Sequence, residues 1–81
     1  MTMLNQLKTG DIARIVCFKN CSSEYKNKFF TKGVSEGSII RIISCFGLIT
    51  FCVISKILSV SYGIAENVRV IKIQEYNKRE R

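Results

Sequence analysis

Four cysteines are the side chains of this sequence most suited to chemistry, as metal ligands or as nucleophiles. They are Cys17, Cys21, Cys45 and Cys52, and the chain has no histidine. Structural zinc sites generally combine Cys-x-x-Cys pairs with one another or with histidines, a spacing that is absent here. We therefore expect no metal site and no cofactor. We interpret the cysteines as reduced, small apolar side chains, with Cys17 and Cys52 packed inside and Cys21 and Cys45 near loops.

The other side chains offer no arrangement suited to catalysis. General acid–base chemistry needs paired titratable groups, and a nucleophilic cysteine or serine needs a neighbouring base. The six acidic residues are scattered, and no glycine-rich phosphate-binding loop occurs. We expect that the protein is not an enzyme, so its function should lie in a binding surface.

Positive charge is the second chemically active property of the chain. Thirteen Lys and Arg residues against six Asp and Glu give a net charge of +7. This charge raises the affinity for any acidic partner, whether nucleic acid, anionic lipid or an acidic protein surface, and does not choose among them. An AT-rich genome would also produce a lysine-rich composition, which leaves open how much of this charge serves binding.

A short basic helix is predicted over residues 24–32. Ser22 or Ser23 can cap its first free amides, and Glu24 suits its positive end. A helix of this length is not stable alone, so it must pack against the rest of the chain. The expected buried stripe consists of Tyr25, Phe29 and Phe30. The expected solvent-facing residues are Lys26, Lys28 and Lys32.

Two glycines organise the segment after this helix. Gly33 stands where a left-handed residue ends a helix at no steric cost, and Gly37 reads as the turn residue before the next strand. The connection fixes where the neighbouring strands must lie.

Strand-like runs at roughly ten-residue spacing determine the predicted fold class. They cover residues 11–18, 38–46, 49–54, 57–61 and 68–73, with a helical turn at 62–67. We expect a mainly β protein, a small five-stranded antiparallel barrel with one short inserted helix and a helical turn before the last strand. Residues 1–74 form one domain in this interpretation, and the charged residues 75–81 are expected to fray.

Alternation within these runs predicts which side chains share a face. Ile40 and Ile42 are expected to point inward. The sets expected to share one face of their strand are Ile49, Phe51 and Val53; Leu58 and Val60; and Val68 and Val70. The alternation in 11–18 is imperfect, which indicates a bulge or a strand covered on its outer face.

Residues spread over most of the chain resemble a known family. They are Leu4-x-x-Leu7-Lys8-x-Gly10-x-x-Ala13-x-Ile15, Lys28-Phe29-x-x-x-Gly33-Val34-x-x-Gly37-Ser38-x-Ile40-x-Ile42-Ile43, and Val53 through Leu58-Ser59-Val60 to Ala65-x-x-Val68-x-Val70. This ordered set, over roughly residues 4–71, is similar to the ferrous iron transport protein A family (FeoA), small SH3-like barrels of bacteria. The chain departs from the family at Lys32, Glu36 and Ser55, where an apolar residue, a proline and a glycine are usual.

The resemblance implies an accessory and regulatory role in bacterial ferrous iron uptake. The implied partner is the ferrous iron permease, a membrane protein with a cytoplasmic GTP-binding domain. We expect a cytoplasmic protein that reaches the membrane only through this partner. The most apolar run, residues 45–54, has half the length of a membrane-spanning helix. Because the basic helix adjoins the glycine turn, the residues expected to border the contact are Lys26, Lys28, Lys32 and Val34.

The alternative function is a small basic barrel that binds nucleic acid. The +7 charge would attract phosphates, and Phe18, Tyr25, Phe46 and Phe51 would stack on bases. These aromatic residues lie in apolar runs, so we expect them to pack in the core and expect no nucleic-acid partner. Self-association through exposed strands is also compatible with a barrel of this size.

Overall fold

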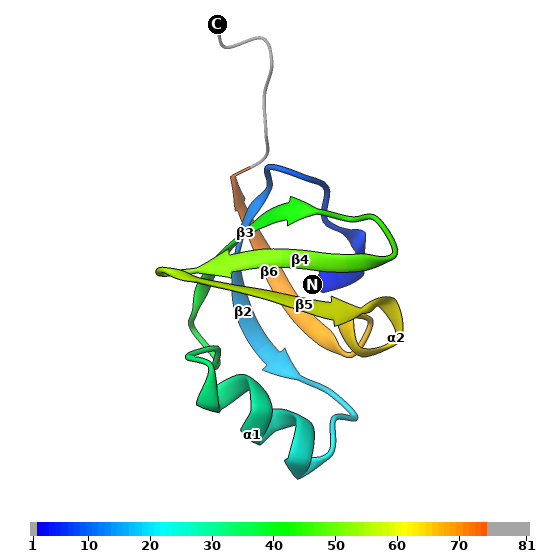
Figure 1. Ribbon diagram of the computed structural model, residues 1–81. Coiled ribbons are helices and arrows are strands. Elements are labelled where there is room, and N and C mark those ends of the chain that lie inside the picture. The colour runs from blue at the N-terminus through cyan, green and yellow to red at the C-terminus, as the bar shows by residue number, and fades with distance from the viewer. Residues whose placement is uncertain (1, 75–81) are drawn as a thin grey trace, which may run out of the picture.

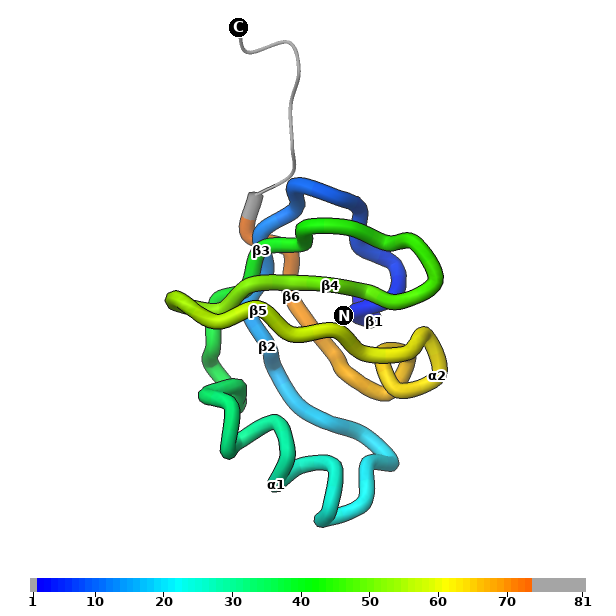
Figure 2. Tube along the Cα trace, viewed as in Figure 1, coloured from blue at the N-terminus to red at the C-terminus, as the bar shows by residue number. Residues whose placement is uncertain are grey.

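The computed structural model describes residues 2–74 as one curved antiparallel sheet with two short helices (Figures 1 and 2). The elements are β1 (Thr2–Met3), a 3₁₀ turn (Leu4–Gln6), β2 (Ile12–Phe18), α1 (Ser23–Thr31), β3 (Ile39–Ser44), β4 (Leu48–Val53), β5 (Lys56–Ser61), α2 (Tyr62–Ala65) and β6 (Val68–Gln74). The strand order is β1-β6-β2-β3-β4-β5. In Figure 1, β4 and β5 cross in front of β2 and β6, so the sheet wraps around one core.

The mainly β fold with an inserted helix is confirmed, but the sheet has six strands rather than five. Thr2 pairs with Val70 and Met3 with Arg69, which adds β1 to the free edge of β6. A strand of two residues is too short to produce an alternating pattern, so periodicity could not detect it.

The core follows the predicted alternation. Residues of alternate parity in β3, β4 and β6 are buried, and Leu58 of β5 joins them with 8% of its surface exposed. The core consists of Leu4, Leu7, Ala13, Ile15, Phe29, Val34, Ile40, Ile42, Ile49, Phe51, Val53, Leu58, Ala65, Val68 and Val70. The expected irregularity of the first long strand is also present, because the pairing of β2 with β6 shifts between Ile15 and Cys17.

Helix α1 is held by its two ends. The Ser22 hydroxyl accepts a hydrogen bond from the Tyr25 amide, at 3.3 Å, and caps the helix start. After the helix, the Val34 amide donates to the Phe29 carbonyl and the Gly33 amide to the Phe30 carbonyl, the pattern of a Schellman motif. Gly33 has a φ of +86°, which confirms its predicted role as the residue that stops the helix.

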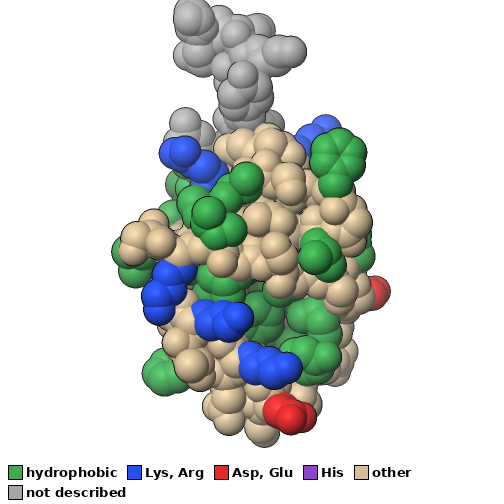
Figure 3. Space-filling view, in the orientation of Figure 1, with side chains coloured by type: hydrophobic (Ala, Val, Ile, Leu, Met, Phe, Trp, Pro, Cys, Tyr) green, Lys and Arg blue, Asp and Glu red, His purple; other side chains and the backbone are tan. Residues whose placement is uncertain are grey.

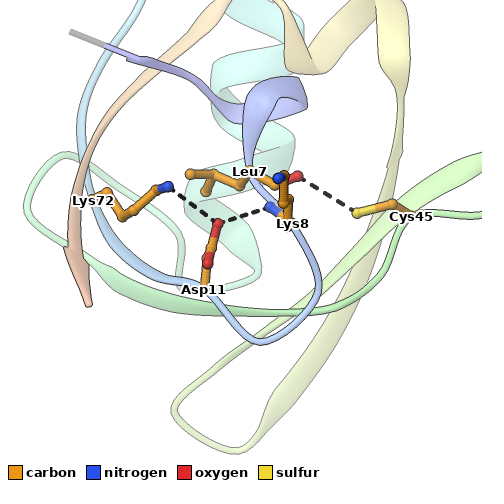
Figure 4. Close-up of polar contacts among 5 residues, drawn as sticks. All are labelled: Leu7, Lys8, Asp11, Cys45 and Lys72. Atoms are coloured by element: carbon orange, nitrogen blue, oxygen red, sulfur yellow. Dashed lines mark hydrogen bonds and ion pairs between the residues drawn. The ribbon is translucent and has the colours of Figure 1, made fainter. Parts of the chain in front are cut away.

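One buried carboxylate ties the segment before β2 to the last strand (Figure 4). Asp11 is 2% exposed, and its Oδ2 accepts a hydrogen bond from the Lys8 amide at 2.8 Å. The same oxygen lies 3.6 Å from Lys72 Nζ, on β6. Beside it, the Cys45 thiol donates to the Leu7 carbonyl at 3.8 Å. These contacts fix the path of the chain between the 3₁₀ turn and β2.

Several aromatic side chains expected in the core are exposed instead. Tyr25 is 42% exposed, Phe30 71% and Phe46 93%, whereas Phe29 is buried. The expected stripe of α1 was therefore wrong at Tyr25 and Phe30, because a short helix resting on a curved sheet buries only its innermost side chain. Phe46 lies in the β3–β4 turn beside Gly47, beyond the paired residues of either strand.

All four cysteines are free and only partly buried. Cys17 and Cys52, which were expected to be buried, are therefore only partly buried. Cys17 lies at the register shift of β2, and Cys52 points to the opposite face of β4 from Phe51 and Val53. The segment 75–81, which we expected to fray, lies outside the described residues.

Candidate functional site

The four predicted contact residues do not form one surface. Lys28 and Lys32 line a groove between α1 and β5, while Lys26 lines a second groove on the other side of the helix. Val34 is 1% exposed and belongs to the core, although it reaches the floor of the second groove. Residues four apart, such as 28 and 32, share one face of a helix, whereas residue 26 lies on the opposite side. The basic side chains are therefore separated.

The α1–β5 groove has an apolar floor and a basic side. Its volume is about 340 Å³, at the lower end of the range for ligand pockets. Its lining comprises Tyr25, Lys28, Phe29 and Lys32 of α1, Leu58, Ser59, Val60 and Ser61 of β5, and Ile64 of α2. Figure 3 shows this hollow between β5 and α1, with hydrophobic side chains inside it and Lys or Arg side chains along one side.

Local structure explains how each wall is positioned. Phe29 stacks on Phe18 at the end of β2, with ring centroids 5.1 Å apart, which anchors α1 to the sheet. The Ser61 hydroxyl accepts from the Ile64 amide at 3.2 Å, so the end of β5 also caps α2 and sets Ile64 at the end of the groove. Helix α1 thus builds one concave surface with β5 and α2, which follow each other in sequence and lie far from α1 along the chain.

The electrostatics of the groove favour an acidic partner. No acidic side chain lines the groove. Its two positively charged side chains, Lys28 and Lys32, are exposed. Lys28 Nζ lies 5.5 Å from the centre of the Tyr25 ring, a cation–π arrangement that holds the ammonium group beside the groove. The groove is therefore suited to an apolar side chain flanked by carboxylates.

The second groove has a mixed lining. It has a volume of about 360 Å³ and is lined by Phe18, Lys26, Asn27, Phe30, Val34, Ser35 and Glu36. Lys26 and Glu36 give it both signs of charge, so it selects less strongly for an acidic partner. Across residues 2–74, no three His, Cys, Asp or Glu side chains gather as metal ligands.

The β5 and α2 residues of the α1–β5 groove were missed by sequence reasoning. In the sequence, Ser59 and Ser61 only alternate with Leu58 and Val60, and Tyr25 was expected in the buried stripe of the helix. The alternation of Leu58 and Val60 with the serines marked an amphipathic strand. No local signal showed that this strand would lie opposite α1.

A family model described as the FeoA domain matches residues 2–72. The chain belongs to the FeoA family. This match runs from β1 into β6 and includes both helices, and it confirms the resemblance carried by the glycine turn and the strands. Membership associates the chain with ferrous iron uptake, in a family of small accessory domains.

Solved structures of FeoA proteins share the fold. An iron uptake regulatory protein (FeoA) has 22% identity and a TM-score of 0.78, with 89% of this chain and 96% of that chain covered. A FeoA-like protein from Clostridium acetobutylicum has 18% identity and a TM-score of 0.77, with both chains fully covered. FeoA from Chlorobium tepidum has 16% identity and a TM-score of 0.79, covering 96% of this chain and 76% of that one. The comparison with curated proteins gave no match.

Two residues that depart from the usual family pattern, Lys32 and Glu36, each line one of the two grooves. Lys32, where an apolar residue is usual, lines the α1–β5 groove and adds to its positive charge. Glu36 is exposed beside Gly37, whose φ is +95°, and lines the second groove. Within the described part of the chain, no helix is long and apolar enough to cross a membrane.

Proposed function

We propose that this FeoA protein acts in ferrous iron uptake as a cytoplasmic accessory and regulatory protein that binds the ferrous iron permease and its GTP-binding domain. The α1–β5 groove is the proposed contact, and its apolar floor with Lys28 and Lys32 beside it is the observation that carries the proposal. A small domain with a basic, apolar-floored groove is suited to protein contact, in which a buried apolar anchor is surrounded by polar groups.

The arrangement of the aromatic residues supports protein contact over nucleic-acid binding. Phe51 is fully buried, and Phe18 stacks on Phe29. Tyr25 lines the groove, whereas Phe46 lies in the turn between β3 and β4. Single-stranded nucleic acid is usually bound along a path of exposed aromatic and basic side chains, and these residues do not form such a path.

The proposal is tested by charge reversal inside and outside the α1–β5 groove. Lys28→Glu/Lys32→Glu should weaken binding of the purified cytoplasmic portion of the permease by about tenfold or more, because two ion pairs become repulsive. The matched control is Lys19→Glu/Lys26→Glu, which makes the same change of charge outside the groove. Surface plasmon resonance gives both affinities, and thermal unfolding verifies that both variants fold.

The two outcomes that contradict the proposed contact are distinct. Equal weakening by both double variants would mean that net charge, rather than the groove, attracts the permease. Undiminished binding by Lys28→Glu/Lys32→Glu would exclude the groove. Oligonucleotide titration at low salt tests the alternative function, since phosphate binding is strongest there.

A further inference from the structure

Strand β5 has a free edge. It pairs with β4 from Leu48↔Ser61 to Val53↔Lys56 without a register shift, and it ends the strand order of the sheet. The pair Val53↔Lys56 closes a two-residue turn and is therefore a hydrogen-bonded pair. Such pairs alternate along an antiparallel ladder, so the amides and carbonyls of Ile57 and Ser59 point away from β4.

This free edge borders the α1–β5 groove. Leu58, Ser59, Val60 and Ser61 line the groove from one side and α1 lines it from the other. Within residues 2–74, no strand pairs with this edge and no backbone hydrogen bond joins Ile57 or Ser59 to another element. The Ser59 hydroxyl is engaged with Thr50 Oγ1, at 2.8 Å, on the outer face of the sheet, so it does not satisfy the backbone at the edge.

We propose that the free edge of β5 binds an extended, acidic segment of the partner protein as an added strand. The N–H and C=O groups of Ile57 and Ser59 supply the backbone hydrogen bonds, as in other cases of strand addition. Alternate side chains of the added strand point to the same side, so an apolar one enters the groove over Leu58 and Val60. This inference rests on the proposed function, because it specifies how the permease would occupy the groove.

Charge decides between an acidic segment and a second copy of this chain. Lys28 and Lys32 lie across the groove from β5, and the net charge is +7. Pairing of two β5 edges would bring two such basic surfaces together, and like charges oppose that approach. A segment carrying Asp or Glu next to its apolar anchor places carboxylates beside both lysines.

A proline at the edge tests the backbone pairing. Ser59→Pro removes the outward N–H without removing a bond to β4, a position at which an edge strand tolerates proline. It should weaken binding of the permease's cytoplasmic portion by roughly tenfold. The matched variant Ser59→Ala removes the hydroxyl and retains the amide, so it should bind the permease portion about tenfold more tightly than Ser59→Pro does. Thermal unfolding verifies the fold of both variants.

Amide hydrogen exchange of the unsubstituted chain provides a second measurement that does not depend on the folding of a variant. In the complex, the Ile57 and Ser59 amides should exchange at least about tenfold more slowly than in the free protein. Unchanged exchange at both amides, or equal binding by Ser59→Pro and Ser59→Ala, would overturn the added strand. The groove itself would still stand if Lys28→Glu/Lys32→Glu weakened binding.

Two further outcomes also count against the inference. If the permease portion fails to bind the unsubstituted chain, the proposed function and the added strand both fail. If sedimentation shows a dimer that Ser59→Pro dissociates and the permease portion does not, the edge serves a second copy instead.

Discussion

The rings of Phe18 and Phe29 stack with their centroids 5.1 Å apart and their planes 22° from parallel. Phe18 ends β2, and Phe29 is the buried residue of α1. This contact joins the helix to the sheet and so holds one wall of the α1–β5 groove. A structural contact between two aromatic residues therefore maintains the candidate binding site.

Loss of the Phe29 ring should lower the stability of the fold. Phe29→Ala should lower the free energy of unfolding by about 3 kcal/mol, because it leaves a cavity under α1. Urea denaturation measures this change. Phe30→Ala, at a neighbouring side chain that is 71% exposed, should change stability by less than about 0.5 kcal/mol. Similar losses in both variants would show that the Phe18–Phe29 contact does not anchor the helix.

Ile54 is a point of backbone strain in the β4–β5 turn. Its φ is +56°, which a β-branched residue rarely adopts, and its side chain is 92% exposed, so no packing offsets the strain. Ile54→Gly should raise the free energy of unfolding by about 0.5 to 1 kcal/mol, since relief of strain exceeds the added entropy of the unfolded chain.

Ile57→Gly is the control for the turn, because Ile57 is an exposed isoleucine in the regular part of β5. It should lower the thermal midpoint, as glycine weakens a strand interior. A lower midpoint for Ile54→Gly as well would mean that the turn is unstrained.

The buried carboxylate of Asp11 should contribute to stability through the groups that it contacts. Asp11→Ala removes the acceptor of the Lys8 amide and the partner of Lys72, and should cost about 2 to 3 kcal/mol. Asp11→Asn retains an acceptor oxygen and should cost less. Guanidinium chloride titration of the two variants gives the comparison, and an equal cost would show that the hydrogen bond to Lys8 adds nothing.

Burial raises the pKa of the Cys21 thiol above its ordinary value, and the positive charge of Lys26 opposes this effect without cancelling it. At mildly alkaline pH the folded protein should therefore hold less thiolate at Cys21 than the unfolded chain does. Iodoacetamide should modify Cys21 more slowly in the folded state, as peptide mass mapping can measure, and Lys26→Ala should slow the reaction further.

The same shift has a consequence for stability. The unfolded chain releases the Cys21 proton first as the pH rises, so the unfolded state binds fewer protons there and stability falls with increasing pH. At pH values below the ordinary pKa of a thiol, Cys21 is protonated in both states, so stability no longer depends on pH through this group. Cys21→Ser should flatten the alkaline part of the stability curve, and an unaltered curve would contradict the expected contribution.

The amino-acid sequence by itself determined the mainly β fold, the family and the residue that stops the helix. Alternation placed Ile40, Ile42 and Phe51 on the inner face because a strand turns successive side chains to opposite sides. Gly33 stops the helix because glycine, which has no Cβ, adopts the left-handed conformation at little steric cost. These features depend on neighbours along the chain.

Tertiary structure alone decided the candidate site. The curvature of the sheet brought β5 opposite α1, so Ser59 and Lys28, distant in sequence, came to line one groove. It also chose Phe29 rather than Phe30 for the core and set Lys26 apart from Lys28. A helix too short to be stable alone takes its orientation from the surface against which it lies, and β2 and β5 contribute to that surface.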